Sequence, residues 1–159
     1  MPEVLTPQQI ARVQMDLPNF PASLIDEWLG PYVLSEGWPP ELDDAAIAPN
    51  RWRYLLGDRP LGYWSTLTWM LRNLSLELAQ IEPSSRDAIQ KLIDGHMHGA
   101  NNEYTRDIPD GKERFDSILR HIAKTGLVPG HPVLVAVPRG LEIFDGNHRL
   151  AAYFALRER

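Results

Sequence analysis

The chain has 159 residues, of which 43% are hydrophobic and 23% charged, and its formal net charge is −5. This composition predicts a globular protein with a single domain over residues 1–159, and the acidic balance excludes a surface that is basic throughout. Cysteine is absent, which excludes disulfides, thiolate metal sites and a cysteine nucleophile.

Residues 1–100 are expected to form short helices separated by proline and glycine. The first residues lack the basic and apolar regions of a secretory signal, and no apolar run approaches a membrane span. We therefore expect a cytoplasmic protein that does not contact membranes. Thr6, Pro7 and Gln9 have the spacing of a helix cap with proline in the first turn. Residues 21–29 predict a second helix, ended by the Gly-Pro pair that follows.

Leucine is dense in residues 61–80, which predicts a long, largely buried helix. A further helix is expected to begin in the Ser-Ser-Arg-Asp segment at residues 84–87 and to end at Gly95. His96 and His98 then fall in a loop, where alternate residues face the same side and both imidazoles would reach one metal ion. The alternative is a polar surface loop, and on a helix the two side chains would diverge.

The C-terminal part has a different texture. Residues 112–124 predict a helix, because apolar residues recur at spacings of three and four, and a glycine follows. Residues 131–137 and 141–145 are short, β-branched-rich runs that predict strands, joined by a tight hairpin loop at residues 138–140. A helix over residues 147–156 completes the order helix, strand, strand, helix, so we expect an α+β fold.

The strand-to-helix corner is the strongest candidate for chemistry. Gly146 is placed at the corner, and Asn147, His148 and Arg149 occupy the first helical turn. Free N–H groups and the positive end of the helix dipole favour a bound phosphate there, and the guanidinium of Arg149 adds a forked donor. The helix dipole should also lower the pKa of the His148 imidazole. The alternative is a turn with two surface donors.

Residues 51–54 alternate basic and aromatic side chains, a pattern that stacks on single-stranded bases. The alternative is a buried aromatic face with solvated arginines. Any contact with DNA is expected to come from a local basic patch, because the chain as a whole is acidic. The candidate patches are Arg139, Arg149, Arg157 and Arg159, or Arg51 and Arg53.

The string Asp-Gly-Asn-His-Arg-Leu-Ala-Ala at residues 145–152 resembles the ParB/sulfiredoxin-like superfamily. The order of the preceding segments, 114–118, 126–127 and 131–135, is also similar to that superfamily. The resemblance covers roughly a third of the chain. It implies a ParB/sulfiredoxin-like nucleotide-binding core at residues 101–159, to which the first hundred residues add a helical N-terminal extension.

In that superfamily the corner binds the phosphates of ATP, ADP or CTP, a role that falls here on residues 146–149. The opposing helix would contribute Arg114 and Ser117. His121 stands where the sulfiredoxin branch has a threonine, so that contact differs. Asp145 is a candidate ligand for Mg²⁺ beside the phosphates, with a turn or cap role as the alternative.

Sulfiredoxins place a cysteine where this chain has Asn147, so sulfinic-acid reduction is excluded. The resemblance is compatible with small plasmid-borne fertility-inhibition proteins of the Osa type. It implies an enzyme that binds and hydrolyses a nucleoside triphosphate, with His148 and Arg149 in catalytic roles and with ATP and Mg²⁺ as cofactors. It is also compatible with nuclease (DNase) activity, with DNA or a DNA-transfer apparatus as the target. One alternative is a non-catalytic nucleotide sensor that docks a protein partner through its helical part. A second is a ParB-like small-molecule kinase.

Overall fold

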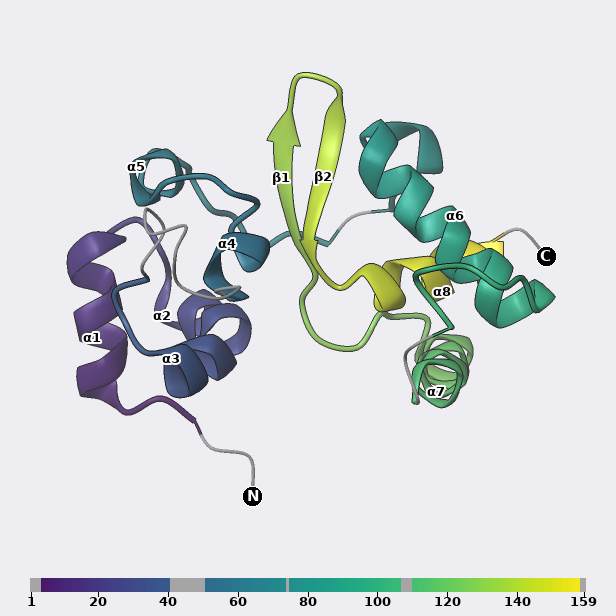
Figure 1. Ribbon diagram of the computed structural model, residues 1–159, viewed down its shortest axis with the longest axis horizontal. Helices are drawn as coiled ribbons and strands as arrows, with labels where there is room; N and C mark the ends of the chain where they lie inside the picture. Colours follow the sequence, from purple (N-terminus) through teal and green to yellow (C-terminus); the bar gives the residue numbers. More distant parts are fainter. Residues whose placement is uncertain (1–3, 41–50, 74, 107–109, 158–159) are drawn as a thin grey trace. The chain divides into compact units, whose positions relative to one another are not determined.

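The computed structural model describes residues 4–40, 51–73, 75–106 and 110–157, and the chain divides into two compact units, Met1–Leu74 and Ser75–Arg159 (Figure 1). Helices and one two-stranded antiparallel sheet make it an α+β protein, as predicted. Within the described ranges no helix is long and apolar enough to cross a membrane.

Short helices build the first unit. They are α1 (Pro7–Asp16), α2 (Ala22–Leu24), the π-helical turn η1 (Ile25–Leu29), α3 (Gly30–Glu36), α4 (Arg51–Leu55) and α5 (Leu61–Trp64). The cap predicted for α1 is confirmed: the Thr6 hydroxyl accepts a hydrogen bond from the Gln9 amide at 3.1 Å, and the Gln9 side chain accepts one from the Thr6 amide at 2.8 Å.

The helix end predicted at the Gly-Pro pair is wrong, because the chain stays helical from Ala22 to Glu36. Pro31 lies in the first turn of α3 and, having no N–H, donates no backbone hydrogen bond there. The wider π-helical turn at η1 precedes it and accommodates the change in hydrogen bonding.

The long helix predicted over residues 61–80 is also wrong, since α5 ends at Trp64. The side-chain amide of Asn19 donates hydrogen bonds to the carbonyl oxygens of Trp64 at 2.9 Å and Leu67 at 2.6 Å, and these bonds hold the chain in a non-helical path. Trp69 packs with its ring parallel to that of Trp64, at 6.4 Å between centroids. Leu71 is 82% exposed, so leucine density here does not mark a buried face.

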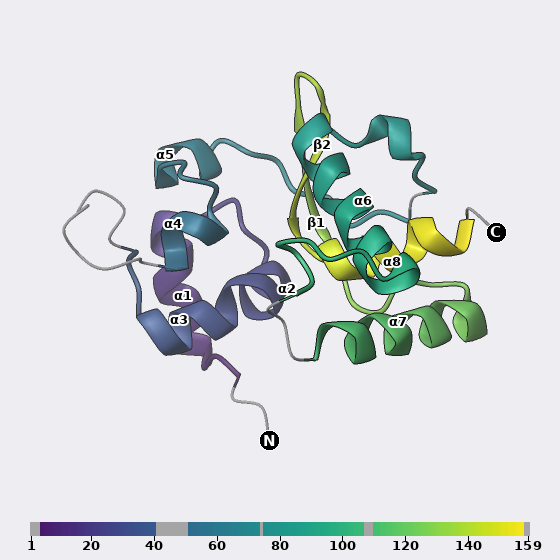
Figure 2. The same cartoon turned by 45° about the vertical axis from the view of Figure 1, so that its right-hand side comes forward.

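The second unit contains η2 (Leu78–Gln80), α6 (Pro83–His98), α7 (Gly111–Thr125), β1 (Val133–Val137), β2 (Gly140–Asp145) and α8 (Asn147–Arg157). The predicted order of helix, strand, strand and helix from residue 112 onward is therefore confirmed. Helix α8 packs on both α6 and α7 (Figure 2).

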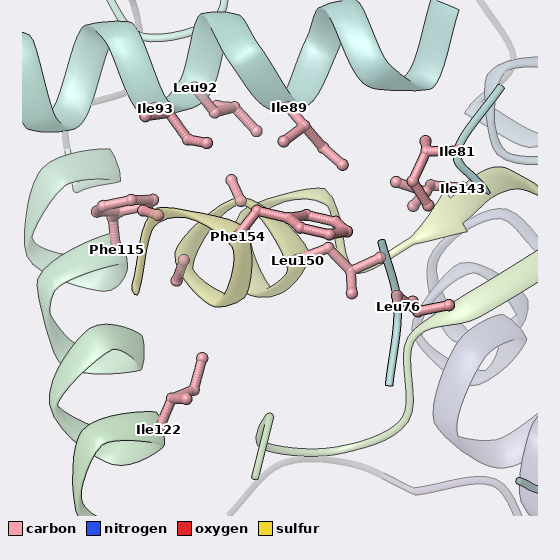
Figure 3. Packing of buried hydrophobic residues seen from close by; sticks show 13 residues of the cluster. Leu76, Ile81, Ile89, Leu92, Ile93, Phe115, Ile122, Ile143, Leu150 and Phe154 are labelled. Carbon is pink, nitrogen blue, oxygen red and sulfur yellow. The ribbon is translucent and has the colours of Figure 1, made fainter. Parts of the chain in front are cut away.

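The core of the second unit forms around α8 (Figure 3). Leu150 and Phe154 of α8 lie among apolar side chains of α6, α7 and β2. The remaining buried residues of α8 are small, namely Ala151, Ala152 and Ala155, each at most 4% exposed. Small side chains let neighbouring helices approach closely, so α8 is the central helix of this unit.

Helix α6 begins and ends elsewhere than predicted. Its cap is Glu82, whose carboxylate accepts a hydrogen bond from the Ser85 amide at 2.5 Å. The helix passes through Gly95 and ends at His98, with Gly99 in the left-handed conformation. A Cβ on Gly95 would overlap the Thr105 side chain, so this glycine permits close packing and does not terminate the helix.

The hairpin joins β1 to β2 through a two-residue turn, since Val137 pairs with Gly140. The outer edge of β2 is covered by the start of α6 and the segment before it. The Glu82 amide donates to the Leu141 carbonyl at 2.9 Å, and the Ile143 amide donates to the buried Ser85 hydroxyl at 3.0 Å. These bonds hold β2 at Leu141 and Ile143, and the strand then ends at Asp145, where the candidate site begins.

Candidate functional site

The predicted strand-to-helix corner is confirmed: β2 ends at Asp145 and α8 begins at Asn147. Gly146 stands between them with φ +95°, and its carbonyl accepts a hydrogen bond from the Leu150 amide at 2.9 Å. The first amides of an α-helix have no acceptor within the helix, and the helix dipole places partial positive charge there. The corner therefore presents backbone donors suited to an anion.

Glycine is required at position 146 for two local reasons. Its positive φ is strained for any side chain, and an added Cβ would lie 2.9 Å from the Cβ of Pro132 and 3.1 Å from Nη2 of Arg149. The corner is thus packed tightly against the loop that precedes β1.

Arg149 ties this loop to the corner. Its Nη2 lies 3.0 Å from Oδ2 of Asp145, and its Nη1 donates to the Pro129 carbonyl at 3.1 Å. The side chain is only 20% exposed. Guanidinium has five N–H donors. The three donors left over make no hydrogen bond to the described residues.

Asp145 was expected as a Mg²⁺ ligand or as a turn residue. Its carboxylate forms the ion pair with Arg149, which already supplies a positive charge beside it. Among the described residues, no three or more histidine, aspartate or glutamate side chains gather into a group that fits a metal ion. The surroundings of Asp145 therefore do not fit a protein-held Mg²⁺.

His148 turns from the first turn of α8 into the unit, where its Nε2 is buried and has no hydrogen-bond partner among the described residues. Burial, followed by the nearby Arg114 guanidinium and His96, lowers the pKa of His148 to about 4. The predicted lowering of the His148 pKa is confirmed, but its main cause is burial away from water rather than the helix dipole. The imidazole is neutral at pH 7, so it adds no positive charge to the corner.

His96 of α6 is the neighbour that sequence reasoning did not connect to the corner. Its ring centroid lies 5.5 Å from that of His148, and it stacks on Phe115 at 5.0 Å with 28° between the planes. Burial also lowers the pKa of His96, with Lys112 acting in the same direction and Asp116 opposing it.

His96 continues the buried face of α6 that includes Ile89, Leu92 and Ile93. This helical spacing was the signal in the sequence, obscured by the expectation that Gly95 ends the helix. His98 is exposed, so the two histidines diverge, and the loop predicted for them is wrong.

The opposing helix α7 carries Arg114 and Ser117, both exposed. Helix α7 packs on α8, and the Arg114 guanidinium contributes, after burial, to the lowered pKa of His148. A phosphate contact by Arg114 stays a prediction. Ser117 lies one turn further along α7, and Asn147 is half-buried at the corner.

No family model, no curated protein and no solved structure matches this chain.

The arginines expected to contact DNA are mostly engaged within the protein. Arg53 pairs with Asp58 at 3.2 Å, and Arg51 lies over the Tyr32 ring at 5.1 Å. Trp52 is buried, whereas Tyr54 is 85% exposed. Of the other candidates, Arg149 and Arg157 are in ion pairs, Arg139 is exposed in the hairpin turn, and Arg159 lies outside the described residues.

Proposed function

We propose that the unit Ser75–Arg159 binds the phosphates of a nucleoside triphosphate at the start of α8. The observation that carries this proposal is the position of the Arg149 guanidinium, which is fixed at the first turn of the helix with three N–H donors unused. The resemblance of residues 145–152 to the ParB/sulfiredoxin-like superfamily supports the same assignment.

The physical basis is a pre-organised set of donors. Open amides and the dipole of an eleven-residue helix favour an anion at the corner. The ion pair with Asp145 and the bond to the Pro129 carbonyl hold the guanidinium still, so less side-chain entropy is lost on binding. A hydrogen bond to a charged group contributes about 1.5–3 kcal/mol.

Binding, rather than turnover, is the function that this geometry favours. A hydrolase needs a group that activates water, and the carboxylate that precedes the corner, Asp145, is paired with Arg149. His148 is neutral, but its Nε2 is buried and does not face an acceptor among the described residues. We therefore place a nucleotide-sensing role first and hydrolysis or DNA cleavage after it.

A calorimetric panel tests the proposal. ATP, GTP, CTP and UTP are titrated into the full chain with Mg²⁺, together with the matching monophosphates and nucleosides, and phosphate release is measured on the same samples. We expect triphosphates to bind more tightly than monophosphates, and nucleosides not to bind, because the phosphates make the contacts.

The matched variants are Arg149→Lys, which keeps the charge but loses the fork, and Arg139→Lys in the exposed hairpin turn. The first should weaken triphosphate binding about tenfold, equivalent to about 1.4 kcal/mol, and the second should not change it. Equal binding of nucleosides and triphosphates, or no binding by the wild type, would overturn the proposal.

A further inference from the structure

One side of α7 presents basic residues to solvent. Phe115 and Ile122 on the opposite side are buried in the core of the unit. The exposed side carries Arg114, Ser117, Arg120, His121 and Lys124, all of them exposed. Glu113 is the acidic residue on this side. Arg114, Ser117, Arg120, His121 and Lys124 together are called the basic face of α7.

The three permanent cations of this face are unpaired. Within the described residues, Arg114, Arg120 and Lys124 form no salt bridge. Four other cations of the unit are in ion pairs. They are Lys91 with Asp87 and Glu103, Lys112 with Asp116, Arg149 with Asp145, and Arg157 with Glu77.

The local charge also differs from that of the whole chain. Helix α7 contains four basic and two acidic residues, a net charge of +2, in a chain whose net charge is −5. Asp116 is 3.1 Å from Lys112, which leaves Glu113 as the one acid of α7 beside the three unpaired cations and a net charge of +2 on this side. Their mutual repulsion is unfavourable, and a polyanion would relieve it.

We propose that the basic face of α7 docks on the phosphate backbone of a nucleic acid. Arg114 and Lys124 are ten residues apart, which is about 15 Å along a helix. Successive phosphates of one strand advance about 3.4 Å along the duplex axis, so the face spans several phosphates. Arginine, lysine and serine side chains are the usual partners of phosphate oxygens, and such contacts position a protein without reading sequence.

A membrane surface fits this face less well. Membrane-bound amphipathic helices insert an apolar side into the lipid, whereas the apolar side of α7 is already buried against α8. Leu127 beyond the helix is 67% exposed, but it is a single apolar residue. Arg114 and Ser117 are shared with the predicted phosphate site, whereas Arg120 and Lys124 have no part in it, so variants at these two positions test the proposal separately from triphosphate binding.

Fluorescence anisotropy with a short labelled duplex DNA and its single strand tests the proposal. With three phosphates neutralised, the slope of log affinity against log salt should be about −2.7 on duplex, an affinity loss of roughly 40-fold between 50 and 200 mM salt. Arg120→Gln with Lys124→Gln removes two contacts, so the slope should fall to about −0.9.

The matched control is Arg12→Gln with Arg72→Gln, which removes the same charge from the other unit and should leave the slope at its wild-type value. Triphosphate affinity, measured on all proteins, should be unchanged by either pair. Three results would each overturn the proposal: no binding by the wild type at 50 mM salt, equal slopes for both pairs of variants, or binding only to vesicles containing anionic lipid.

Discussion

His96 and His148 face each other across the junction of α6 and α8, with ring centroids 5.5 Å apart and the Nε2 of each buried without a hydrogen-bond partner among the described residues. The charges that act on this pair come mainly from α7. Arg114 and Lys112 disfavour a further positive charge, and Asp116 favours one at His96. Burial, the largest cause, acts together with these charges to lower the pKa of both imidazoles in the folded state.

Acid should destabilise the second unit through this pair. The pKa of His148 is about 4 in the folded state and near 6.5 in the unfolded state. Between these values the unfolded chain binds more protons, so the free energy of unfolding should fall as the pH drops from about 6.5 to about 4. Urea unfolding followed by circular dichroism across this range measures the change.

Carboxylates also titrate in part of this range, so the comparison of variants decides the question. His148→Leu should flatten the dependence between pH 6.5 and 5, whereas His98→Leu, at an exposed position on the same helix as His96, should not. If His148→Leu keeps the wild-type slope, the buried imidazole is not the origin of the acid sensitivity.

Arg149→Ala should destabilise the corner as well as weaken phosphate binding. The change removes the ion pair with Asp145 and the bond to the Pro129 carbonyl. We expect a loss of about 1–3 kcal/mol in the free energy of unfolding by urea titration. Arg139→Ala should stay within about 0.5 kcal/mol of the wild type. Equal stability of the two variants would contradict the structural role assigned to the guanidinium.

Gly146→Ala should also be destabilising, by about 1–3 kcal/mol, because the backbone has a positive φ and the new Cβ would press on Pro132. Gly62→Ala is the control, since nothing lies within 4 Å of the added Cβ in α5. Alanine there should be neutral or stabilising because it favours helix more than glycine does. Thermal unfolding of both variants checks the prediction, which fails if Gly146→Ala melts at the wild-type temperature.

Ser85→Ala tests how β2 is held. The buried hydroxyl is the acceptor for the Ile143 amide, and its loss leaves that N–H unsatisfied at a cost of about 1–3 kcal/mol. Ser84→Ala, one residue earlier and exposed, should change stability by less than about 0.5 kcal/mol. Hydrogen exchange of the Ile143 amide should accelerate in the first variant alone, and unchanged protection would count against the assigned bond.

Local patterns in the sequence were sufficient for several elements. The cap at Thr6 predicts the start of α1, and apolar spacing with a following glycine predicts α7. The hairpin and the corner at Gly146 were predicted because turn residues and β-branched runs act over a few neighbouring positions. The positions of Gly146 and Arg149 at one helix start follow from the same local order.

Packing between distant residues decided the rest. The Asn19 side chain and the aromatic cluster around Trp69 set the path of residues 65–73, which leucine density had suggested was helical. Gly95 lies inside α6, where Thr105 packs against it and leaves no room for a Cβ, a contact that no local pattern contains.

The chemistry of the corner divides in the same way. The sequence identified the phosphate-binding candidates, because Gly146, His148 and Arg149 are neighbours in the chain. Tertiary structure alone decided that Arg149 pairs with Asp145 and reaches the Pro129 carbonyl, and that His148 meets His96 inside the unit. Burial and the charges of α7 then set the protonation of the imidazoles, and both depend on segments that are adjacent only after folding.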